Sequence, residues 1–295
     1  MEENKNSNES TNFIKSFQTL KIEILKEKKI LHVQLNRPDR LNALNDTLFT
    51  EIHKLFSNMH LITTSEDIRV IVISGNGKAF TSGLDLNSNI AQNILTIKSN
   101  TEIDSGRKAF FLYMEIKKLQ DSLTAIESCH LPTIAAIHGF CLGGGVSLLG
   151  CIDIKIAHKN AKFSIKEVDI GLTADLGALQ RLVKQTGKEG LIKKYSLTGE
   201  IFTAEDALKA GIIEEVVEKE EDALKTAFSL GERIAEKSPV VTWGVKRMIN
   251  YSRDNSVASS LDMVATLNSA LIQSDDIVET LQNILLKKKA AYPKL

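Results

Sequence analysis

The sequence predicts an α/β fold, on the basis of two observations. Three short apolar runs, at residues 30–35, 69–74 and 133–138, are typical of buried or half-buried strands. Between them lie segments whose apolar residues recur at helical spacing, as they do between Leu44 and Met59. Strands that alternate with helices indicate an α/β body, although they leave the order of the strands open.

The first predicted elements follow from local pattern. Residues 30–35 alternate apolar and polar side chains, and Pro38 prevents this strand from continuing. The next segment is predicted to be a helix with Asn45 as its N-cap, because asparagine often occupies that position. The β-branched run at residues 70–74 is apolar on both faces and is predicted to be a fully buried strand.

The middle of the chain is less regular. Residues 87–107 are polar and weakly periodic, so we expect a mobile loop with short helical pieces that covers a site. Helices are predicted at residues 110–129 and 176–187, with a buried strand at 133–138 between them. Thr203 is predicted to cap another helix, whose first turn contains acidic residues.

The two ends of the chain differ in character from this body. From Ala223 onward only helical patterns occur, so the chain is predicted to divide near residue 220. This gives an α/β core at residues 19–220 and a helical region at 221–295. Residues 1–18 are mostly polar and are expected to be a disordered tail, resembling neither a secretory signal nor a mitochondrial presequence.

Composition excludes several classes of function. The 295 residues carry 37 basic and 37 acidic side chains, so charge gives no reason to expect nucleic acid as a partner. No apolar run approaches the ~20 residues that span a bilayer, so no membrane insertion is expected. The three cysteines lack CxxC spacing, and no His, Asp or Glu cluster has metal-ligand spacing, so neither disulfides nor a metal site are predicted.

A glycine cluster, Gly143-Gly144-Gly145, follows the predicted strand at 133–138 and precedes a helix-like segment at 146–151. Glycines allow close backbone approach to a ligand, and a helix N-terminus presents free N–H groups, which favours an anion or oxyanion site. A tight strand-to-helix turn explains the cluster equally well.

A second N–H donor is predicted at Ser82-Gly83, which follows the strand at 69–74. Two backbone donors on one carbonyl oxygen would stabilise an enolate or a tetrahedral oxyanion. This requires the two glycine-containing segments to converge in the fold.

Two carboxylates, Glu167 and Asp175, lie eight residues apart (175 − 167), with Gly171 between them in a predicted loop. Proton transfer at carbon requires carboxyl groups whose pKa is raised by apolar surroundings. The alternative is a pair of solvated loop acids.

Together these residues make the chain resemble the crotonase (enoyl-CoA hydratase/isomerase) superfamily. The resemblance is strong and covers almost everything after about residue 19. It runs through Leu31-Asn36-Arg37-Pro38, Asn42-Ala43-Leu44, Phe80-Thr81-Ser82-Gly83-Leu84-Asp85-Leu86, Gly139-Gly143-Gly144-Gly145, Thr203-Ala204-Glu205-Ala207, Gly211-Ile212 and Ser238-Pro239.

Within that superfamily the chain is most similar to the Δ3,5-Δ2,4-dienoyl-CoA isomerases. This similarity rests on the segments at 166–172, 174–177, 179–182 (LQRL) and 251–258 (YSRDNSVA). It implies a crotonase-like spiral of ββα units with a helical C-terminal trimerisation region, and a homotrimer or homohexamer.

The resemblance also implies a mechanism. The N–H groups of Ser82 and Gly144 would polarise an acyl-CoA thioester, and Glu167 and Asp175 would carry protons in a 1,5-shift of β-oxidation. Which acid serves C2 and which C6 stays open. No cofactor is implied, because coenzyme A is part of the substrate. The substrate would lie against Ser82, Gly83, Leu84, Asp85, Leu86, Gly143 and Gly145.

Ser147 departs from the family pattern. It stands where hydratases carry a water-activating glutamate and dienoyl isomerases an aspartate, and a hydroxyl cannot act as a base near neutrality. Hydration is therefore disfavoured. Two alternatives remain: a Δ3-Δ2-enoyl-CoA isomerase that uses Glu167 alone, and a non-catalytic acyl-CoA-binding member of the family.

The chain ends in Pro293-Lys294-Leu295, which differs by one residue from the peroxisomal address Ser-Lys-Leu. The sequence therefore predicts a peroxisomal protein that binds an import receptor through its C-terminus, with the mitochondrion as the alternative location. The other interpretation of these residues is an ordinary basic tail.

Overall fold

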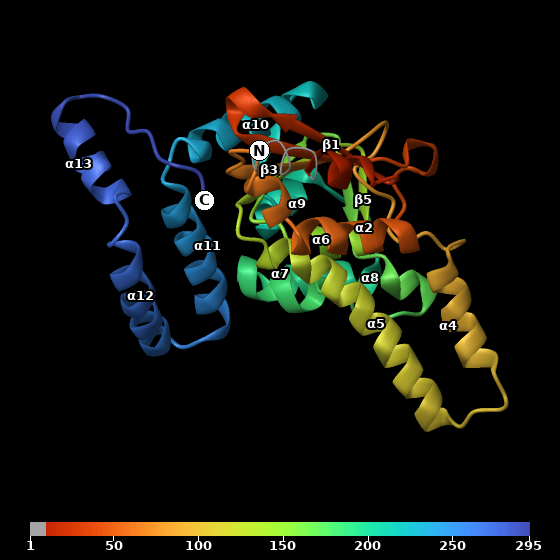
Figure 1. The fold of residues 1–295 in the computed structure, drawn as a ribbon. Helices are drawn as coiled ribbons and strands as arrows, with labels where there is room; N and C mark the ends of the chain where they lie inside the picture. The colour runs from red at the N-terminus through yellow and green to blue at the C-terminus, as the bar shows by residue number, and fades with distance from the viewer. Residues whose placement is uncertain (1–9) are drawn as a thin grey trace.

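A computed structural model describes residues 10–295 of the protein (Figure 1). Its centre is a six-stranded sheet in which neighbouring strands have the order β1-β2-β3-β4-β6-β9. The strands are β1 (Leu20–Leu25), β2 (Ile30–Leu35), β3 (Val70–Gly75), β4 (Thr133–Ile137), β6 (Ile154–His158) and β9 (Glu215–Val217). Only the β1–β2 pair is antiparallel, and the other four pairs are parallel.

A smaller sheet adjoins this one and carries the chain past the glycine cluster. It contains β5 (Phe140–Leu142), β7 (Lys162–Ser164) and β8 (Phe202–Thr203), in the order β5-β7-β8. β5 pairs in parallel with β7, and β7 pairs antiparallel with β8. Because β5 follows β4 almost directly, the glycines after β5 lie near the carboxyl ends of the large sheet's strands.

Helices cover both faces of the large sheet. On one face, α10 (Glu220–Ala235) packs Ala223 and Ala227 against buried strand residues such as Ile30 and Val70. On the other face, a larger apolar core includes side chains of α2 (Asp46–Ser57) and α5 (Ser105–Ser128). The parallel strands read as continuous apolar runs because they are buried on both sides.

The remaining helices are shorter or peripheral. They are α3 (His60–Thr63), α4 (Asn89–Ser99), α6 (Gly144–Leu149), α7 (Ala178–Thr186), α8 (Glu189–Thr198), α9 (Ala204–Ala210), α11 (Pro239–Asp254), α12 (Val257–Leu271) and α13 (Asp276–Leu285). There are also three short 3-10 helices: η1 (Lys26–Lys28), η2 (Pro38–Arg40) and η3 (Glu167–Ile170). None of the described helices is long and apolar enough to cross a membrane.

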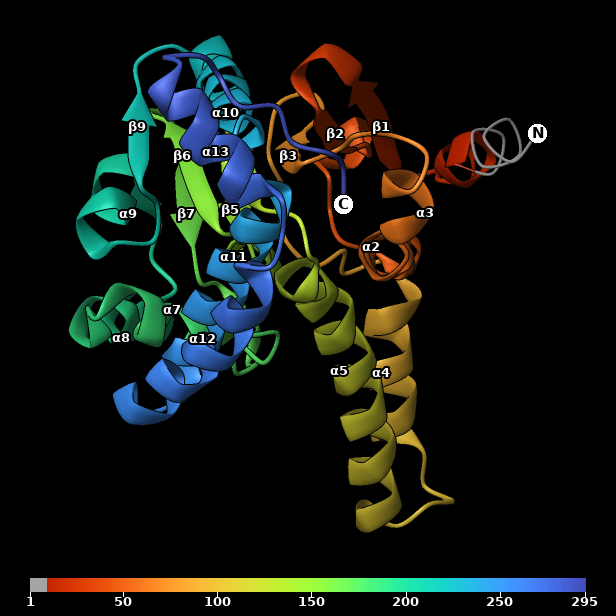
Figure 2. The same cartoon turned by 60° about the vertical axis from the view of Figure 1, so that its left-hand side comes forward.

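Two helical arms project from this body (Figures 1 and 2). One is the α4–α5 hairpin, and the other contains α12 and α13, which follow α11. Each arm exposes large apolar side chains, among them Phe110 on the first and Leu285 on the second.

Most predicted elements are present. Asn45 caps α2 by accepting a hydrogen bond from the N–H of Leu48 (3.0 Å), and the β3 residues are all buried. Thr203 caps α9 and forms a capping box with Asp206, which explains the acidic first turn of that helix.

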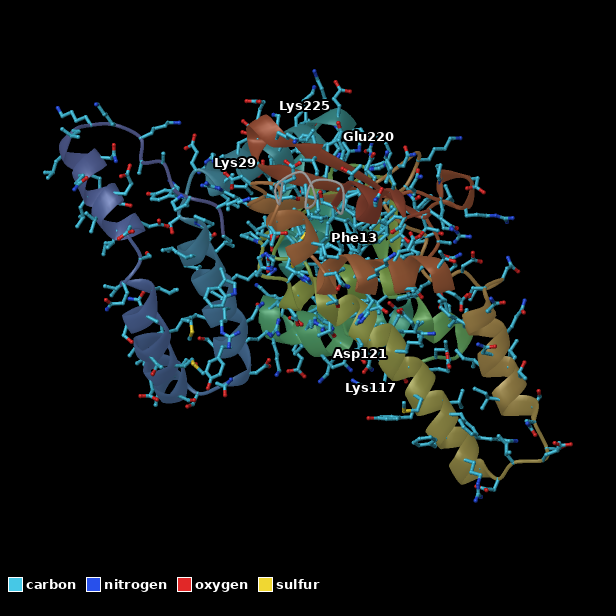
Figure 3. All side chains as sticks on the ribbon, viewed as in Figure 1. Phe13, Lys29, Lys117, Asp121, Glu220 and Lys225 are labelled. Carbon is cyan, nitrogen blue, oxygen red and sulfur yellow. The ribbon has the colours of Figure 1, made fainter. Side chains whose placement is uncertain are left out.

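Three predictions need correction. Residues 87–107 contain α4, an 11-residue helix that packs Ile90 and Ile94 into the core. Residues 1–9 of the predicted tail lie outside the described residues, but residues 10–15 are helical and Phe13 packs on the core (Figure 3). The boundary near residue 220 marks the end of the strands only, because α10 belongs to the body.

Candidate active site

The two glycine-containing segments lie side by side, as two N–H donors to one carbonyl oxygen would require. Thr81 and Cys141 form a parallel bridge. The N–H of Thr81 donates to the carbonyl oxygen of Phe140 (2.9 Å), and the N–H of Leu142 donates to the carbonyl oxygen of Thr81 (3.2 Å). Gly83 lies so close to this strand that a Cβ there would be 2.6 Å from the carbonyl oxygen of Leu142. Its φ of +89° also requires glycine.

Gly144 offers one free backbone donor. It is the first residue of α6, and its N–H has no acceptor among residues 10–295. Gly143 precedes it with φ 50° and ψ −119°, a conformation open to glycine alone, and this turn directs the helix N-terminus into the site.

The second free donor is Leu84, and the prediction of Ser82 is wrong. The N–H of Ser82 donates to the carbonyl oxygen of Leu41 at 2.9 Å. Gly83 donates to Thr81 Oγ1 (3.2 Å) and Asp85 to the carbonyl oxygen of Leu44 (3.0 Å). Within residues 82–85, only the N–H of Leu84 has no acceptor in the described part of the chain.

Motif residues that follow strand β2 hold the loop at residues 82–86 in place. Arg37 makes an ion pair with Asp85 at 2.9 Å, and both side chains are largely buried. The buried Asn42 donates through Nδ2 to the carbonyl oxygens of Asn76 and Ala79, both at 2.8 Å. Asp85 therefore shapes the loop through Arg37, whereas Leu86 beside it is 59% exposed and free to meet a ligand.

Glu167 faces the glycine turn. It is half-buried at the start of η3, and a Cβ placed on Gly143 would lie 3.7 Å from its Oε1 atom. Its buried Oε2 has no hydrogen-bond partner among the described residues. Burial raises the pKa of Glu167, and the nearby charge of Asp175 raises it further.

Asp175 lies in the segment before α7 and is also half-buried. Burial raises the pKa of its carboxyl group. The next residue, Leu176, packs beside Gly144, where an added Cβ would be 3.6 Å from Leu176 Cδ1 and 3.3 Å from Leu44 Cδ1. The two carboxyl groups therefore belong to one site with apolar walls, and neither is an ordinary solvated loop acid.

The remaining polar groups near the glycines do not add a base. Ser147 is completely buried, one turn along α6 from Gly144, and its hydroxyl has no partner within residues 10–295. Cys141 is also completely buried, and desolvation raises the pKa of its thiol, so it does not supply a thiolate nucleophile. Gly145 is required because a Cβ there would collide with Thr81 Cγ2.

Two free N–H groups beside two carboxyl groups of raised pKa define a class of chemistry. The donors can bind one carbonyl oxygen and stabilise the enolate that forms when a proton leaves the adjacent carbon. The carboxyl groups can remove and return protons near neutral pH. No group of three His, Cys, Asp or Glu side chains in the described chain is arranged to hold a metal ion.

Fold and site together therefore indicate an enzyme that transfers protons at a carbon atom next to a carbonyl group. The chain belongs to the enoyl-CoA hydratase/isomerase family, whose family model matches residues 25–294.

Two relatives share a large part of the sequence. The mitochondrial Δ3,5-Δ2,4-dienoyl-CoA isomerase of Rattus norvegicus is 42% identical over 89% of this chain and 78% of its own length. The peroxisomal Δ3,5-Δ2,4-dienoyl-CoA isomerase of Arabidopsis thaliana is 39% identical over 96% of this chain and 99% of its own. The fold matches the crystal structure of a putative enoyl-CoA hydratase from Streptomyces coelicolor, with a TM-score of 0.81, 24% identity and 94% of each chain covered.

Proposed function

We propose that this protein is a Δ3,5-Δ2,4-dienoyl-CoA isomerase of unsaturated fatty acid β-oxidation. The observation that carries the proposal is a second half-buried carboxyl group, that of Asp175. A 1,5-proton shift needs one acid near each end of the dienoyl system, and both Glu167 and Asp175 have a raised pKa in one apolar-walled site. The names of the two relatives support the same activity.

In the proposed reaction, the thioester carbonyl accepts hydrogen bonds from the N–H groups of Gly144 and Leu84. Ionised Glu167 removes a proton from C2, and the negative charge spreads over the conjugated dienolate. The double bonds move from C3–C4 and C5–C6 to C2–C3 and C4–C5 as Asp175, initially protonated, donates a proton to C6. Glu167 ends protonated and Asp175 ionised, so a solvent proton exchange restores the enzyme.

The assignment of the two acids follows from their positions. The carboxylate of Glu167 faces Gly143, directly before the proposed donor Gly144, and this supports a role at the carbon next to the carbonyl. Asp175 is joined to Leu176, which forms part of the apolar wall beside Gly144. We therefore assign C2 to Glu167 and C6 to Asp175 in the proposed reaction.

Ser147 separates this reaction from hydration. Hydration requires a base that activates water, and a buried serine hydroxyl cannot hold a charge near neutrality. The coenzyme A part of the substrate would lie against the loops at Ser82 to Leu86 and Gly143 to Gly145, where Leu86 is exposed.

The test is to incubate the purified protein with a 3,5-dienoyl-CoA and to follow the absorbance of the conjugated 2,4-dienoyl product. Appearance of that product supports the proposal. Turnover of a 3-enoyl-CoA without any dienoyl turnover would indicate a Δ3-Δ2-enoyl-CoA isomerase. Binding of both compounds without turnover would indicate a non-catalytic acyl-CoA-binding protein.

We also propose a peroxisomal location and a homotrimer or homohexamer. Pro293-Lys294-Leu295 supports the location through its similarity to Ser-Lys-Leu, and an import receptor would be the partner. The two relatives are named as mitochondrial and peroxisomal, so both compartments are compatible with the family. Deleting residues 293–295 from a tagged protein should abolish a punctate distribution, and unchanged puncta would refute the assignment.

A further inference from the structure

Two arginines from the isomerase-like motifs meet at one buried carboxylate. Glu127, near the end of α5, accepts a hydrogen bond from Arg181 Nε of α7 (3.0 Å). Its other oxygen lies 2.6 Å from Arg253 Nη1 of α11, an ion pair that does not meet hydrogen-bond geometry. All three side chains are between 13% and 17% exposed. The LQRL and YSRD motifs therefore join α5, α7 and α11.

Arg181 also touches the segment that carries Asp175. Its backbone N–H donates to the carbonyl oxygen of Gly177 (2.9 Å), and its guanidinium group packs so closely on Gly177 that a Cβ there would collide with it. Gly177 has φ +121°, which other residues rarely adopt. The guanidinium group of Arg181 thus packs on the chain two residues after Asp175.

One face of α5 completes the support. Gln120 Nε2 donates to the backbone carbonyl oxygen of Asp175 at 2.7 Å. Thr124 Oγ1 accepts from Arg181 Nη2 at 3.0 Å, and Glu127 follows one turn later. Residues four and seven positions apart lie on the same face of a helix. Lys117, one turn before, extends from the same part of α5 (Figure 3) and reaches Gln120 Oε1 at 3.2 Å.

A cavity of about 340 Å³ adjoins this network. Asp175 and Arg181 line it together with Gln120, Thr124 and Glu127. The network therefore adjoins the second acid, whereas Gly144, Leu84 and Glu167 do not line this cavity.

We propose that Arg181 and Gln120 are positioning residues that hold Asp175 within reach of C6, and that Arg253 couples their placement to α11. This inference rests on the proposed dienoyl-CoA isomerase activity. Displacing a proton donor by about 1 Å can lower the rate on the order of a hundredfold. Loss of a residue that positions Asp175 should therefore slow proton transfer at C6 and leave proton transfer at C2 unchanged.

The two halves of the reaction can be measured separately. In D₂O, Glu167 exchanges the C2 hydrogen of a 3,5-dienoyl-CoA, because the dienolate can be reprotonated at C2 with solvent deuterium. Formation of the 2,4-dienoyl product additionally needs the proton from Asp175 at C6. The ratio of product formation to C2 exchange therefore reports on the placement of Asp175.

We expect Arg181→Lys, Gln120→Met and Arg253→Lys each to lower that ratio. Lysine cannot reproduce the forked contacts of a guanidinium group, and methionine keeps the shape of glutamine without the amide donor. Product formation should fall by about tenfold or more while C2 exchange stays within about twofold. Gln120→Met removes only the hydrogen bonds that Gln120 makes with Asp175 and with Lys117, and it keeps the test usable if the arginine variants fold poorly.

Arg69→Lys is the matched control. Arg69 is another buried arginine, 4% exposed, which donates to Ala235 (3.1 Å) and Tyr292 (2.6 Å) at the end of β3 away from the site. This variant should lower Tm and leave the ratio unchanged. Equal losses of exchange and product in the Arg181 and Gln120 variants would overturn the inference. An inactive wild-type protein would instead overturn the proposed function, and this inference with it.

Discussion

The carboxyl groups of Glu167 and Asp175 are held in surroundings that lower the stability of the fold and favour proton transfer. A carboxyl group is most stable in water, yet both are partly withdrawn from it and one oxygen of Glu167 has no partner in the described structure. Burial disfavours the ionised form, which raises each pKa toward the range where a carboxyl group can exchange protons with carbon.

The sign of the stability effect follows from those shifts. A carboxyl group whose pKa is higher in the folded state than in the unfolded state binds protons more tightly when folded. The folded state therefore gains stability as pH falls from the raised pKa toward the ordinary one, and above the raised pKa an ionised carboxylate at either position destabilises the fold. Removing the charge should relieve this destabilisation.

We therefore expect Glu167→Gln and Asp175→Asn to have a Tm at pH 7 at least equal to that of the parent. Product formation from a 3,5-dienoyl-CoA should fall by about a hundredfold or more, the usual contribution of a general acid or base. Thermal unfolding and the absorbance assay measure the two effects. Glu205→Gln, an exposed residue in the first turn of α9, is the matched control and should leave the rate unchanged. A lower Tm together with a near-normal rate would contradict the assignment.

One of the two backbone donors could not be identified from the sequence. Residue types and a glycine run predict Glu167, Asp175 and Gly144 as site residues, and the structure agrees with the glycine turn that Glu167 faces. The sequence misidentifies the second donor as Ser82. The N–H of Ser82 is occupied by the carbonyl oxygen of Leu41, whereas the bridge between Leu44 and Leu84 leaves the N–H of Leu84 free. Such long-range pairings leave no local sequence pattern.

Among the elements, the strands of the large sheet were predictable where they are apolar on both faces, as in β3 and β4. For the arm helix α4 the sequence predicted only short helical pieces in a loop, because the apolar residues Ile90, Ile94 and Ile97 stand in a segment whose other residues are mostly polar. The short strands β5, β7, β8 and β9 have two or three residues each, too few for any periodicity to appear. Tertiary contacts define them.

Strand β2 contains a histidine that should make stability depend on pH. His32 is 4% exposed, contacts Ser74 Oγ through Nε2 at 2.9 Å and packs edge-on against Phe228. Burial, helped by the charge of Lys21, lowers its pKa from 6.5 to about 4. As the pH falls, His32 therefore binds a proton near pH 6.5 in the unfolded chain but only near pH 4 in the folded protein.

Stability should accordingly fall by about 3 kcal/mol as pH decreases from 6.5 to 4, from His32 alone. We expect His32→Leu to flatten the curve of unfolding free energy against pH in this window, as measured by urea denaturation. Burial also lowers the pKa of His130, whose contribution is common to both proteins and cancels in the difference. Ser74→Ala removes the partner but keeps the imidazole, so it should retain the slope. An identical slope in the parent and in His32→Leu would refute this explanation.

At the scale of the whole molecule, two helical arms project from the body (Figure 2), and their large apolar side chains are exposed among the described residues. On α12 and α13, Val257 is 77% exposed, Leu281 58% and Leu285 84%. Monomeric soluble proteins rarely expose such a group of large apolar side chains, and closed symmetric assembly is the usual way to bury one. The surface therefore supports the proposed homo-oligomer.

The wild-type protein should have a molar mass of three or six times 32.6 kDa by light scattering. The double variant Leu281→Lys/Leu285→Lys places two positive charges one turn apart on α13, where association would have to bury them, and is expected to shift the mass toward 32.6 kDa. Leu95→Lys makes the same kind of change on the other arm, at a side chain that is 64% exposed, and should leave at least the trimer intact. A wild-type protein that runs as a monomer at every concentration would refute the oligomer. A double variant that keeps the wild-type mass would show that subunits associate through a surface other than α13.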